Sequence, residues 1–408
     1  MSKVEYKNTL IKDIGRVVTG KTPKTKKSEF YGNGYMFITP AELHDGYNVQ
    51  VSDKYITESG LQSIKSNCID GTSVMVGCIG WDMGNVAICH RKCATNQQIN
   101  SITDFNPKYN PFYTYYWLLT KKDYLFTIAS VTRTPILSKS TFEEIVIPMP
   151  DRSIQDNVVG TLKPIDDMME NNKRICSELE AMAKTLYDYW FVQFDFPDEN
   201  GKPYRTSGGE MVWNKQLKRK IPKEWKPGKL CDIANITMGQ SPAGESYNDA
   251  GDGLFFYQGR TDFGLRFSTP RMYTTAPTRF AQKGDILLSV RAPVGDLNFA
   301  MEDCCIGRGL AALNSKLGSQ MHLFYTLAGF QQIFKVMDEN GTTFGSITKD
   351  RLFDMSVVIP PDEILMCFEK RVKPIESKIE KCEEEIRELT KLRDWLLPML
   401  MHGQARVE

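Results

Sequence analysis

Hydrophobic and polar positions follow two patterns along the chain, and each pattern occurs twice. Short apolar runs between Gly, Pro and polar turn signals fill roughly the first 150 residues and return after position 230. Such runs are typical of β-strands in a mixed α/β globule. The clearest predicted strands cover residues 35–39, 73–78, 145–147, 254–257, 286–290 and 357–359.

After each globule the pattern becomes helical. Over 362–400, apolar residues recur at alternating spacings of four and three, and the same register shifted by 210 falls on 151–191. This heptad seam predicts that the two helices pair as an antiparallel coiled coil, with polar Asn172 and Arg393 selecting the register. Packing of each helix on its own globule is the alternative. The predicted pairing residues are Ile165, Met169, Leu179, Leu186, Ile375, Ile379, Ile386, Leu389 and Leu396.

The two halves are a tandem repeat. EYK at 5–7 returns as EWK at 224–226, and VTGKTP at 18–23 returns as TMGQSP at 237–242. Pro164 and Pro374 also match, and we expect each to kink or restart its helix. The predicted fold class is therefore α+β: two similar mixed α/β globules separated by two long helices that pair as an antiparallel coiled coil, with an internal pseudo-twofold repeat.

The predicted organisation has six parts. The segment 192–229 shows neither helical nor strand periodicity, and its Gly, Pro and charged residues indicate a linker. Its basic cluster, Lys215, Lys218, Arg219, Lys220 and Lys223, is either a phosphate contact or a solvated face. The parts are the first globule 1–150, the first helical spacer 151–191, the linker 192–229, the second globule 230–361, the second helical spacer 362–400 and the tail 401–408.

Composition narrows the class of protein. The 408 residues, 41% of them hydrophobic, suffice for two to three globular domains. Lys+Arg 51 against Asp+Glu 50 gives a formal net charge of +1, so any nucleic-acid surface must be local. No apolar run approaches the roughly 18 residues of a membrane span, and the N-terminus lacks an export signal. We expect a cytoplasmic protein whose ten cysteines are reduced thiols.

Catalytic motifs are incomplete. FYGNG at 30–34 fits an adenine-methyltransferase FxGxG loop, but no (D/N)PP(Y/F) element accompanies it, and a turn between strands is the preferred interpretation. PD at 361–362 with ESK at 376–378 spells a nuclease-like PD…ExK, yet its second half falls in the heptad helix. Cys89, His90 and Cys93 lack further zinc ligands. We therefore predict no catalytic residue, no metal site and no cofactor in this chain.

Several segments, in this order, carry a family resemblance. They are the unit openings LIKDIGRVVTGKTP (10–23) and KLCDIANITMGQSP (229–242), the central YDYWFVQFDFP (187–197) and IPKEWKPGKL (221–230), and the unit ends IVIPMPDRSIQ (145–155) and VVIPPDE (357–363). Over nearly its whole length the chain resembles the DNA sequence-specificity subunit of type I restriction-modification enzymes.

The resemblance implies a non-catalytic subunit of a restriction system. Two target-recognition domains would each read one half of a bipartite double-stranded DNA target, and the helices would set the spacing and dock two methyltransferase (modification) subunits. Adenine N6 methylation and association with restriction/translocase subunits would follow, with S-adenosylmethionine, ATP and Mg²⁺ on those partners and no membrane involved. Because the globules differ between their matched ends, we expect an asymmetric target. Residues 165–191 as a helix would span about 40 Å, close to one DNA turn.

DNA-contacting residues are nominated by chemistry, because arginine pairs with guanine and asparagine or glutamine with adenine. A solvated surface role is the alternative for each. The nominated residues are Lys21, Thr22, Lys24, Lys26, Lys27, Trp81, Asn85, Asn96, Gln97, Gln98 and Arg133 in the first half, and Gln240, Ser241, Arg260, Arg266, Arg291 and Arg308 in the second.

Two other classes of function stay open at this level. A self-contained methyltransferase or nuclease would act without partners, and a coiled-coil scaffold would bind proteins only. The target sequence, its spacer length, the methylated base and the presence of an active restriction subunit are not encoded in any recognisable pattern.

Overall fold

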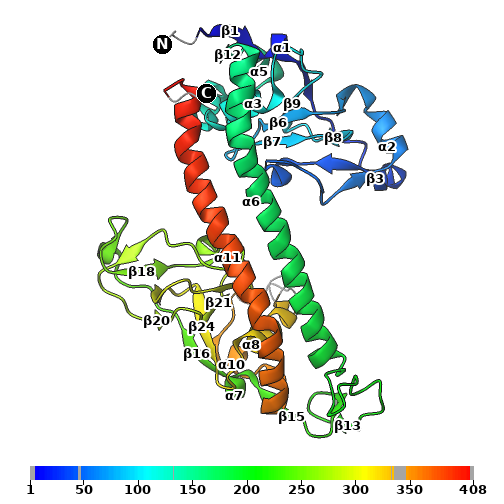
Figure 1. The fold of residues 1–408 in the computed structure, drawn as a ribbon, viewed down its shortest axis with the longest axis vertical. Coiled ribbons are helices and arrows are strands. Elements are labelled where there is room, and N and C mark those ends of the chain that lie inside the picture. The colour runs from blue at the N-terminus through cyan, green and yellow to red at the C-terminus, as the bar shows by residue number, and fades with distance from the viewer. Residues whose placement is uncertain (1–4, 45–46, 132, 332, 335–345, 405–408) are drawn as a thin grey trace. The chain divides into compact units, whose positions relative to one another are not determined.

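The computed structural model describes residues 5–44, 47–131, 133–331, 333–334 and 346–404 (Figure 1). The chain divides into two compact units. The first unit comprises Met1–Asn171 with Arg387–Glu408, and the second comprises Asn172–Ile386. Each unit therefore contains one globule together with part of each long helix, α6 (Arg152–Tyr187) and α11 (Asp362–Met401).

Among the described residues of the first unit, two four-stranded sheets form the globule. The strands of the first sheet, all antiparallel, are β2 (Arg16–Thr19), β9 (Ile99–Thr103), β6 (Ser73–Gly77) and β7 (Val86–Cys89), in that order. The second sheet has the order β4 (Tyr55–Ile56), β3 (Tyr31–Ile38), β8 (Cys93–Thr95) and β5 (Cys68–Ile69), with β3 and β8 parallel. The remaining elements are β1 (Lys7–Leu10), β10 (Ser130–Val131), β11 (Pro135–Ile136), β12 (Val146–Met149), α1 (Ile11–Ile14), α2 (Glu58–Ser63), α3 (Pro111–Leu119), α4 (Lys122–Ile128) and α5 (Lys139–Glu143).

The second unit repeats this plan within its described residues. Its antiparallel sheet has the order β16 (Ala234–Met238), β24 (Leu310–Ser315), β21 (Ile286–Ser289) and β22 (Leu297–Phe299). A mixed sheet follows in the order β17 (Tyr247–Asn248), β19 (Tyr273–Thr274), β18 (Leu254–Tyr257), β23 (Cys304–Ile306) and β20 (Phe280–Ala281), with β18 and β23 parallel. The remaining elements are β13 (Met211–Asn214), β14 (Arg219–Pro222), β15 (Lys226–Lys229), β25 (Ser356–Ile359), α7 (Leu230–Ile233), α8 (Gln320–Gly329) and α10 (Lys349–Phe353).

These strands confirm all six strand predictions, because each predicted segment overlaps β3, β6, β12, β18, β21 or β25. The repeat also explains why the unit openings and unit ends match in sequence. In the first globule β1 pairs with β12, and in the second β15 pairs with β25. The first and last strands of each globule therefore lie together, and the long helix starts directly after this closing pair.

Apolar burial is concentrated beneath these sheets. The first core packs β6, β7 and α3 against the beginning of α6 and the end of α11, with Tyr116 and Phe142 fully buried. The second packs β21, β24 and α8 against the end of α6 and the beginning of α11. Helix α3 has a capped start, since the Asn110 side chain accepts a hydrogen bond from Phe112 N and Pro111 occupies the first helical position.

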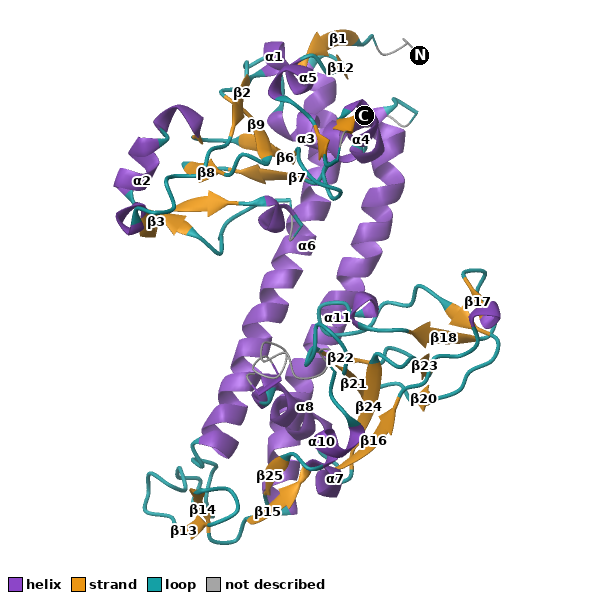
Figure 2. Cartoon of the chain, turned by 180° about the vertical axis from the view of Figure 1, so that it is seen from behind, coloured by secondary structure: helices purple, strands orange, loops and turns teal. Residues whose placement is uncertain are grey.

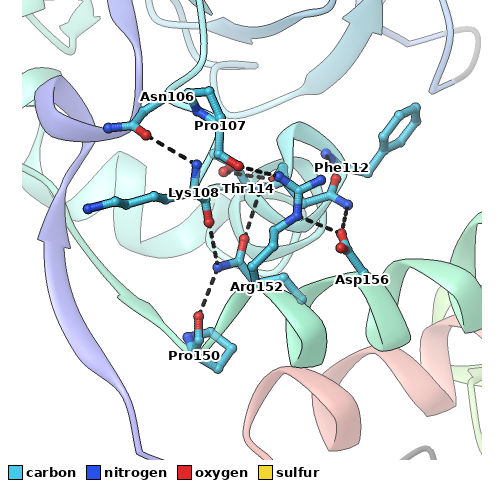
Figure 3. Close-up of polar contacts among 10 residues, drawn as sticks. Asn106, Pro107, Lys108, Phe112, Thr114, Pro150, Arg152 and Asp156 are labelled. Carbon is cyan, nitrogen blue, oxygen red and sulfur yellow. Dashed lines mark hydrogen bonds and ion pairs between the residues drawn. The ribbon is translucent and has the colours of Figure 1, made fainter.

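The first turns of α6 hold the loop that precedes α3 (Figure 3). Arg152 Nη1 donates to Pro107 O at 2.6 Å, and Asn110 Nδ2 donates to Asp156 Oδ1 at 2.6 Å. Gln155 is 1% exposed, accepts from Asn110 N at 2.8 Å and donates to Pro150 O at 2.8 Å. The polar end of the IVIPMPDRSIQ segment therefore fixes the start of the helix on its globule.

Replacing Gln155 with leucine is expected to destabilise the first unit by about 1–3 kcal/mol, because two buried backbone groups lose their partner. Urea unfolding of the full chain measures this loss. The exposed Gln62 provides the control, because its side chain bonds only Glu58 among the described residues. Gln62→Leu should change the free energy of unfolding by less than about 0.5 kcal/mol. Equal effects of the two variants would contradict the anchoring role of Gln155.

The two long helices pair in antiparallel fashion within each unit (Figure 2). In the first unit, Arg393 Nη1 donates to Asp166 Oδ1 at 3.2 Å and Thr390 Oγ1 to Met169 Sδ at 3.3 Å. In the second unit, Asn172 Nδ2 donates to Glu385 Oε2 at 2.9 Å. Positions on α11 fall as positions on α6 rise, as the fold prediction required.

The nominated pairing residues divide between two kinds of contact. Leu179, Ile375 and Ile379 form a small interhelical cluster with the buried thiols Cys176 and Cys382. Packing on the globules, which was the alternative, occurs as well: Leu396 contacts the first core, and Leu186 and Ile375 contact the second. Ile165 and Met169 are buried, whereas Ile386 and Leu389 are half-buried.

Both long helices continue through their prolines, so the expected restart does not occur: α6 runs from Arg152 to Tyr187 through Pro164, and α11 runs from Asp362 to Met401 through Pro374. The expected kink at each proline stays a prediction. Their missing N–H groups are tolerated because packing holds the surrounding turns.

The segment 192–229 is more than a connecting stretch. It contains the β13–β14 hairpin and strand β15, and Phe194, Phe196 and Trp225 lie in the second core. Within its basic cluster, the Arg219 guanidinium lies 4.6 Å from the Phe194 ring centroid, and Lys223 Nζ pairs with Glu210 at 2.8 Å. Aromatic packing, which carries no periodicity in sequence, folds this segment.

Candidate nucleic-acid interface

In the first unit, several loops that connect the strands of the β2-β9-β6-β7 sheet lie together at one end of these strands. Strand β2 ends where β9 begins, since Thr19 pairs with Asn100, and β6 ends where β7 begins, since Val76 pairs with Val86. We call this surface the first loop edge. The loops that meet there are 20–27, 78–85 and 96–98.

The second unit has the equivalent surface, the second loop edge. Strand β16 ends where β24 begins, since Met238 pairs with Ala311, and β21 ends where β22 begins, since Leu288 pairs with Leu297. The corresponding loops are 239–244, 290–296 and 307–309.

Matched backbone hydrogen bonds show that the two loop edges are built in the same way. Lys21 N donates to Thr95 O at 2.9 Å, and Gln240 N donates to Ile306 O at 3.0 Å. Cys78 N donates to Gln98 O at 2.7 Å, as Val290 N does to Gly309 O at 2.9 Å. One backbone scaffold therefore presents two different sets of side chains.

A glycine in each opening motif makes this scaffold possible. A Cβ added to Gly239 would lie 2.1 Å from Gly307 O, and one added to Gly20 would lie 2.1 Å from Asn96 O. Real Cβ atoms do not approach a carbonyl oxygen so closely. The VTGKTP and TMGQSP motifs therefore keep glycine for the close approach of two loops.

Gly239→Ala is expected to destabilise the second unit by about 1–3 kcal/mol, because the new methyl group must displace backbone. Thermal unfolding of the full chain tests this prediction. Gly244→Ala is the control, since nothing lies within 4 Å of a Cβ there. A Gly239→Ala chain as stable as the control would show that the loops separate without cost.

The structure brings most first-half nominees to the first loop edge. Lys21, Lys24, Lys26 and Lys27 are exposed on the loop after β2. In the same loop, Thr22 Oγ1 donates to Gln97 Oε1 at 2.8 Å.

Asn96 serves the loop itself rather than its outer surface. The side chain is buried, accepts a hydrogen bond from Gln98 N at 3.0 Å and donates to Gln98 Oε1 at 2.8 Å. Its nomination as a base contact is therefore not supported by its exposure.

Trp81, Asn85 and Arg133 lie on the far part of the first loop edge. Trp81 is 71% exposed, with its ring centroid 5.9 Å from that of Phe126. Asn85 Oδ1 accepts from Lys122 Nζ at 2.8 Å. Arg133 is exposed in the segment that reaches this loop through Gly80 N, which donates to Pro135 O at 3.0 Å.

Second-half nominees gather in the same way. Gln240 and Arg308 are exposed, and Arg308 N donates to Ser241 Oγ at 3.3 Å. Arg291 is exposed in the β21–β22 loop, where Asp296 forms an ion pair with Arg260.

Arg266 is the exception, and its nomination is wrong. The side chain is 3% exposed and makes two bonds to Glu376, Nη2 to Oε1 at 2.5 Å and Nε to Oε2 at 3.2 Å. Its Cζ lies 3.7 Å from the Phe324 ring centroid. Burial raises the pKa of Glu376, while the guanidinium acts in the opposite direction. A side chain so enclosed ties the globule to its helices and does not reach a ligand.

The first unit contains a related buried group. Asp166, 1% exposed, accepts from Tyr116 OH at 2.6 Å and from Arg393. Tyr325 and Glu376 occupy the matching places of the repeat, and Tyr325 OH bonds Glu376 Oε1 at 3.3 Å. The arginine comes from α11 in one unit and from a globule loop in the other.

Sequence reasoning missed residues that only the strand order brings to the loop edges. Asn67 immediately precedes β5, and its Nδ2 donates to Thr19 O at 2.9 Å. Arg279 precedes β20 at the equivalent place, and Gln258 follows β18. These strands are two to four residues long, so periodicity alone could not have signalled them.

The second loop edge concentrates unneutralised positive charge. Within the part of the chain that the structure describes, Arg279, Arg291 and Arg308 form no ion pair, and on the first loop edge the same holds for Lys21, Lys24 and Lys26. Exposed cations without carboxylate partners favour a polyanion such as a nucleic-acid backbone.

The incomplete catalytic motifs acquire structural roles. The FYGNG segment lies mostly within strand β3, where the pairing with β4 shifts register, so its interpretation as a turn between strands is wrong. Glu376 of the PD…ExK pattern is the partner of Arg266. Cys89 and Cys93 are buried with their sulfur atoms 3.7 Å apart, and the hydrogen bond from Cys93 lowers the pKa of Cys89 to about 7.

No group of three or more His, Cys, Asp or Glu side chains among the described residues is placed to hold a metal ion. None of the described helices is both long enough and apolar enough to cross a membrane.

Comparison with known proteins gives concordant matches. The family model of the type I restriction modification DNA specificity domain matches twice, at residues 3–181 and 222–389. The MjaIX specificity subunit of Methanocaldococcus jannaschii is 29% identical over 98% of this chain and 93% of its own length. The HindI specificity subunit of Haemophilus influenzae is 30% identical over 68% of this chain and 74% of its own. The S-subunit structure from M. genitalium has the same fold, with a TM-score of 0.59, 16% identity and coverage of 98% and 97%.

Proposed function

This chain belongs to the type I restriction-modification DNA specificity family and has two target-recognition domains, and from this premise we propose that each loop edge reads one half of a bipartite DNA target. The observation that carries the proposal is the repeated loop edge itself. The same backbone hydrogen bonds occur twice, and in both units they are accompanied by exposed cations that form no ion pair with a described residue.

An asymmetric target follows from the side chains on this scaffold. Where the first loop edge carries Lys21 and Gln97, the second carries Gln240 and Arg308. Hydrogen-bonding groups of different kinds at matched places select different bases. A symmetric half-site pair would require like residues there.

The helices are proposed to set the spacing of the half-sites and to dock two methyltransferase subunits. Support comes from their continuity, because 36 residues of α6 and 40 of α11 run without interruption. The internal repeat supports two copies of one partner, since each unit offers the same combination of globule and paired helices. We propose the limits of the two globules and the two helices as the sequence gives them, with the segment 192–229 packed on the second core instead of forming a free linker. Residues 401–404 of the tail are described, and the rest of the tail lies outside the described residues.

Chemistry is assigned to the partner subunits. Adenine N6 methylation with S-adenosylmethionine, and restriction with ATP and Mg²⁺, would take place there, and this chain would act as a non-catalytic DNA-recognition subunit. The structural roles of the two incomplete catalytic motifs support this assignment. FYGNG takes part in strand pairing, and Glu376 forms an ion pair with Arg266.

Co-expression with the neighbouring methyltransferase subunit tests the proposal. Genomic N6-methyladenine, mapped with and without this chain, should show a split motif that depends on the chain. Replacing 230–361 with the corresponding globule of a relative should change one half of the motif and leave the other unchanged. If neither deletion of this chain nor replacement of 230–361 changed the methylation pattern, a scaffold that binds only proteins would be the better explanation.

A further inference from the structure

The position shared by Gln97 and Arg308 differs in chemistry between the two loop edges. Both residues lie in the loop that leads into an inner strand of the antiparallel sheet, two residues before β9 or β24 begins. The loop conformation is the same in both, since Ile99 N donates to Asn96 O at 3.2 Å and Leu310 N to Gly307 O at 3.0 Å.

The hydroxyl groups of Thr22 and Ser241, which lie beside Gln97 and Arg308, form different hydrogen bonds in the two units. In the first, Thr22 Oγ1 donates to Gln97 Oε1 and so orients the carboxamide. This bond uses one lone pair of Oε1 and leaves the other lone pair and both Nε2 protons for a ligand. In the second, Ser241 Oγ instead accepts from the backbone N of Arg308, and the guanidinium stays free of ion pairs within the described residues.

These two arrangements match two different base edges. An oriented carboxamide both accepts from adenine N6 and donates to N7, whereas a free guanidinium donates twice to guanine O6 and N7. Neighbouring residues cannot substitute, because Gln98 Oε1 is held by Asn96 and Gly309 has no side chain.

We propose that Gln97 and Arg308 are a matched pair of specificity-determining residues, with Gln97 selecting adenine in one half-site and Arg308 selecting guanine at the equivalent place of the other. This inference rests on the proposed function and adds the identity of one base in each half. It also accounts for asymmetry on a symmetric scaffold with a single exchanged side chain.

The test is methylation mapping of the chain co-expressed with its methyltransferase subunit, on genomic DNA, for the single variants Arg308→Gln and Gln97→Arg. Arg308→Gln should weaken the preference for guanine at one position by about 5- to 150-fold, the range of one bidentate base contact, with the other half-site unchanged. Gln97→Arg should move the preference from adenine to guanine at one position of the other half. Unchanged motifs in both variants would overturn the proposal.

Arg308→Lys separates base reading from phosphate binding. Lysine keeps the charge but loses the planar pair of donors, so the guanine preference should fall as it does in Arg308→Gln. If Arg308→Lys instead kept the motif while Arg308→Gln lowered methylation equally at all sequences, Arg308 would contact phosphate and the inference would be wrong.

Matched controls are Lys283→Gln and Arg91→Gln. Both residues are exposed and precede strands at the opposite end of their sheets, so their loss should leave both half-sites unchanged. Retention of the remaining motif positions shows that each variant is folded. Absence of any split motif with the unmodified chain would refute the proposed function itself, an outcome distinct from an unchanged motif in the variants.

Discussion

Replacing Arg266 with methionine is expected to lower the free energy of unfolding of the second unit by about 3–5 kcal/mol. The loss arises because the Glu376 carboxylate stays buried, 11% exposed, without the guanidinium that compensates its desolvation. Chemical denaturation of the full chain, followed by tryptophan fluorescence of the second core, measures the change. Lys223→Met removes an exposed ion pair of the same unit and should cost less than about 1 kcal/mol.

The loss in Arg266→Met should also depend on pH. Burial raises the pKa of Glu376 in the folded chain, so between the ordinary and the raised value the folded state binds more protons than the unfolded state. Stability contributed by this group is therefore present at low pH and declines as pH rises through that interval. Removing Arg266 raises the pKa further, and the variant should approach the parent chain at acid pH.

The double variant Arg266→Met with Glu376→Met separates pairing from packing. Replacing a whole buried ion pair with apolar side chains is often neutral, so the double variant should recover much of the lost stability. A double variant as unstable as Arg266→Met would show that shape, rather than the unpaired charge, causes the loss.

Replacing Arg279, Arg291 and Arg308 of the second loop edge with glutamine is expected to lower the DNA affinity of the assembled methyltransferase complex at least about 100-fold. None of the three forms an ion pair with a described residue. Each glutamine substitution removes a cation that favours a phosphate or a base. Fluorescence anisotropy with duplex DNA containing the mapped motif, repeated over a range of salt concentrations, gives both the affinity and its salt dependence.

The salt dependence distinguishes phosphate binding from base recognition. The slope of log affinity against log salt should become shallower by about 0.9 for each phosphate that the variant no longer neutralises. The triple substitution of Lys12, Lys139 and Lys349 with glutamine, on exposed side chains outside the loop edges, is the control and should change affinity less than about threefold. Equal reductions in affinity in both triple variants would indicate general charge attraction rather than a defined DNA surface.

Short-range information in the sequence determined most of the local structure. The strand predictions at β3, β6, β12, β18, β21 and β25 are confirmed, because apolar runs bounded by turn residues specify strands through neighbours in the chain. The heptad register predicted a helix pair, and the hydrogen bonds of Met169 and Asn172 with α11 confirm it in each unit. The predictions that the structure contradicts are the helix restarts at Pro164 and Pro374, the turn at FYGNG, the exposure of Arg266 and the absence of strands in 192–229. Each of these features depends on pairing or packing with distant residues.

The sequence by itself determined the repeat, the two-globule plan, the paired helices and the family resemblance. Each of these depends only on the spacing of apolar residues or on the order of motifs along the chain. Only the tertiary structure decided which polar side chains face outward. Arg266 and Arg308 are the same residue type, yet Arg266 is enclosed by Glu376 and Phe324, whereas Arg308 is exposed on a loop edge. The reason is physical: exposure and pairing of a charge depend on what the strand order places beside it, and residues from separate strands meet only in the folded chain.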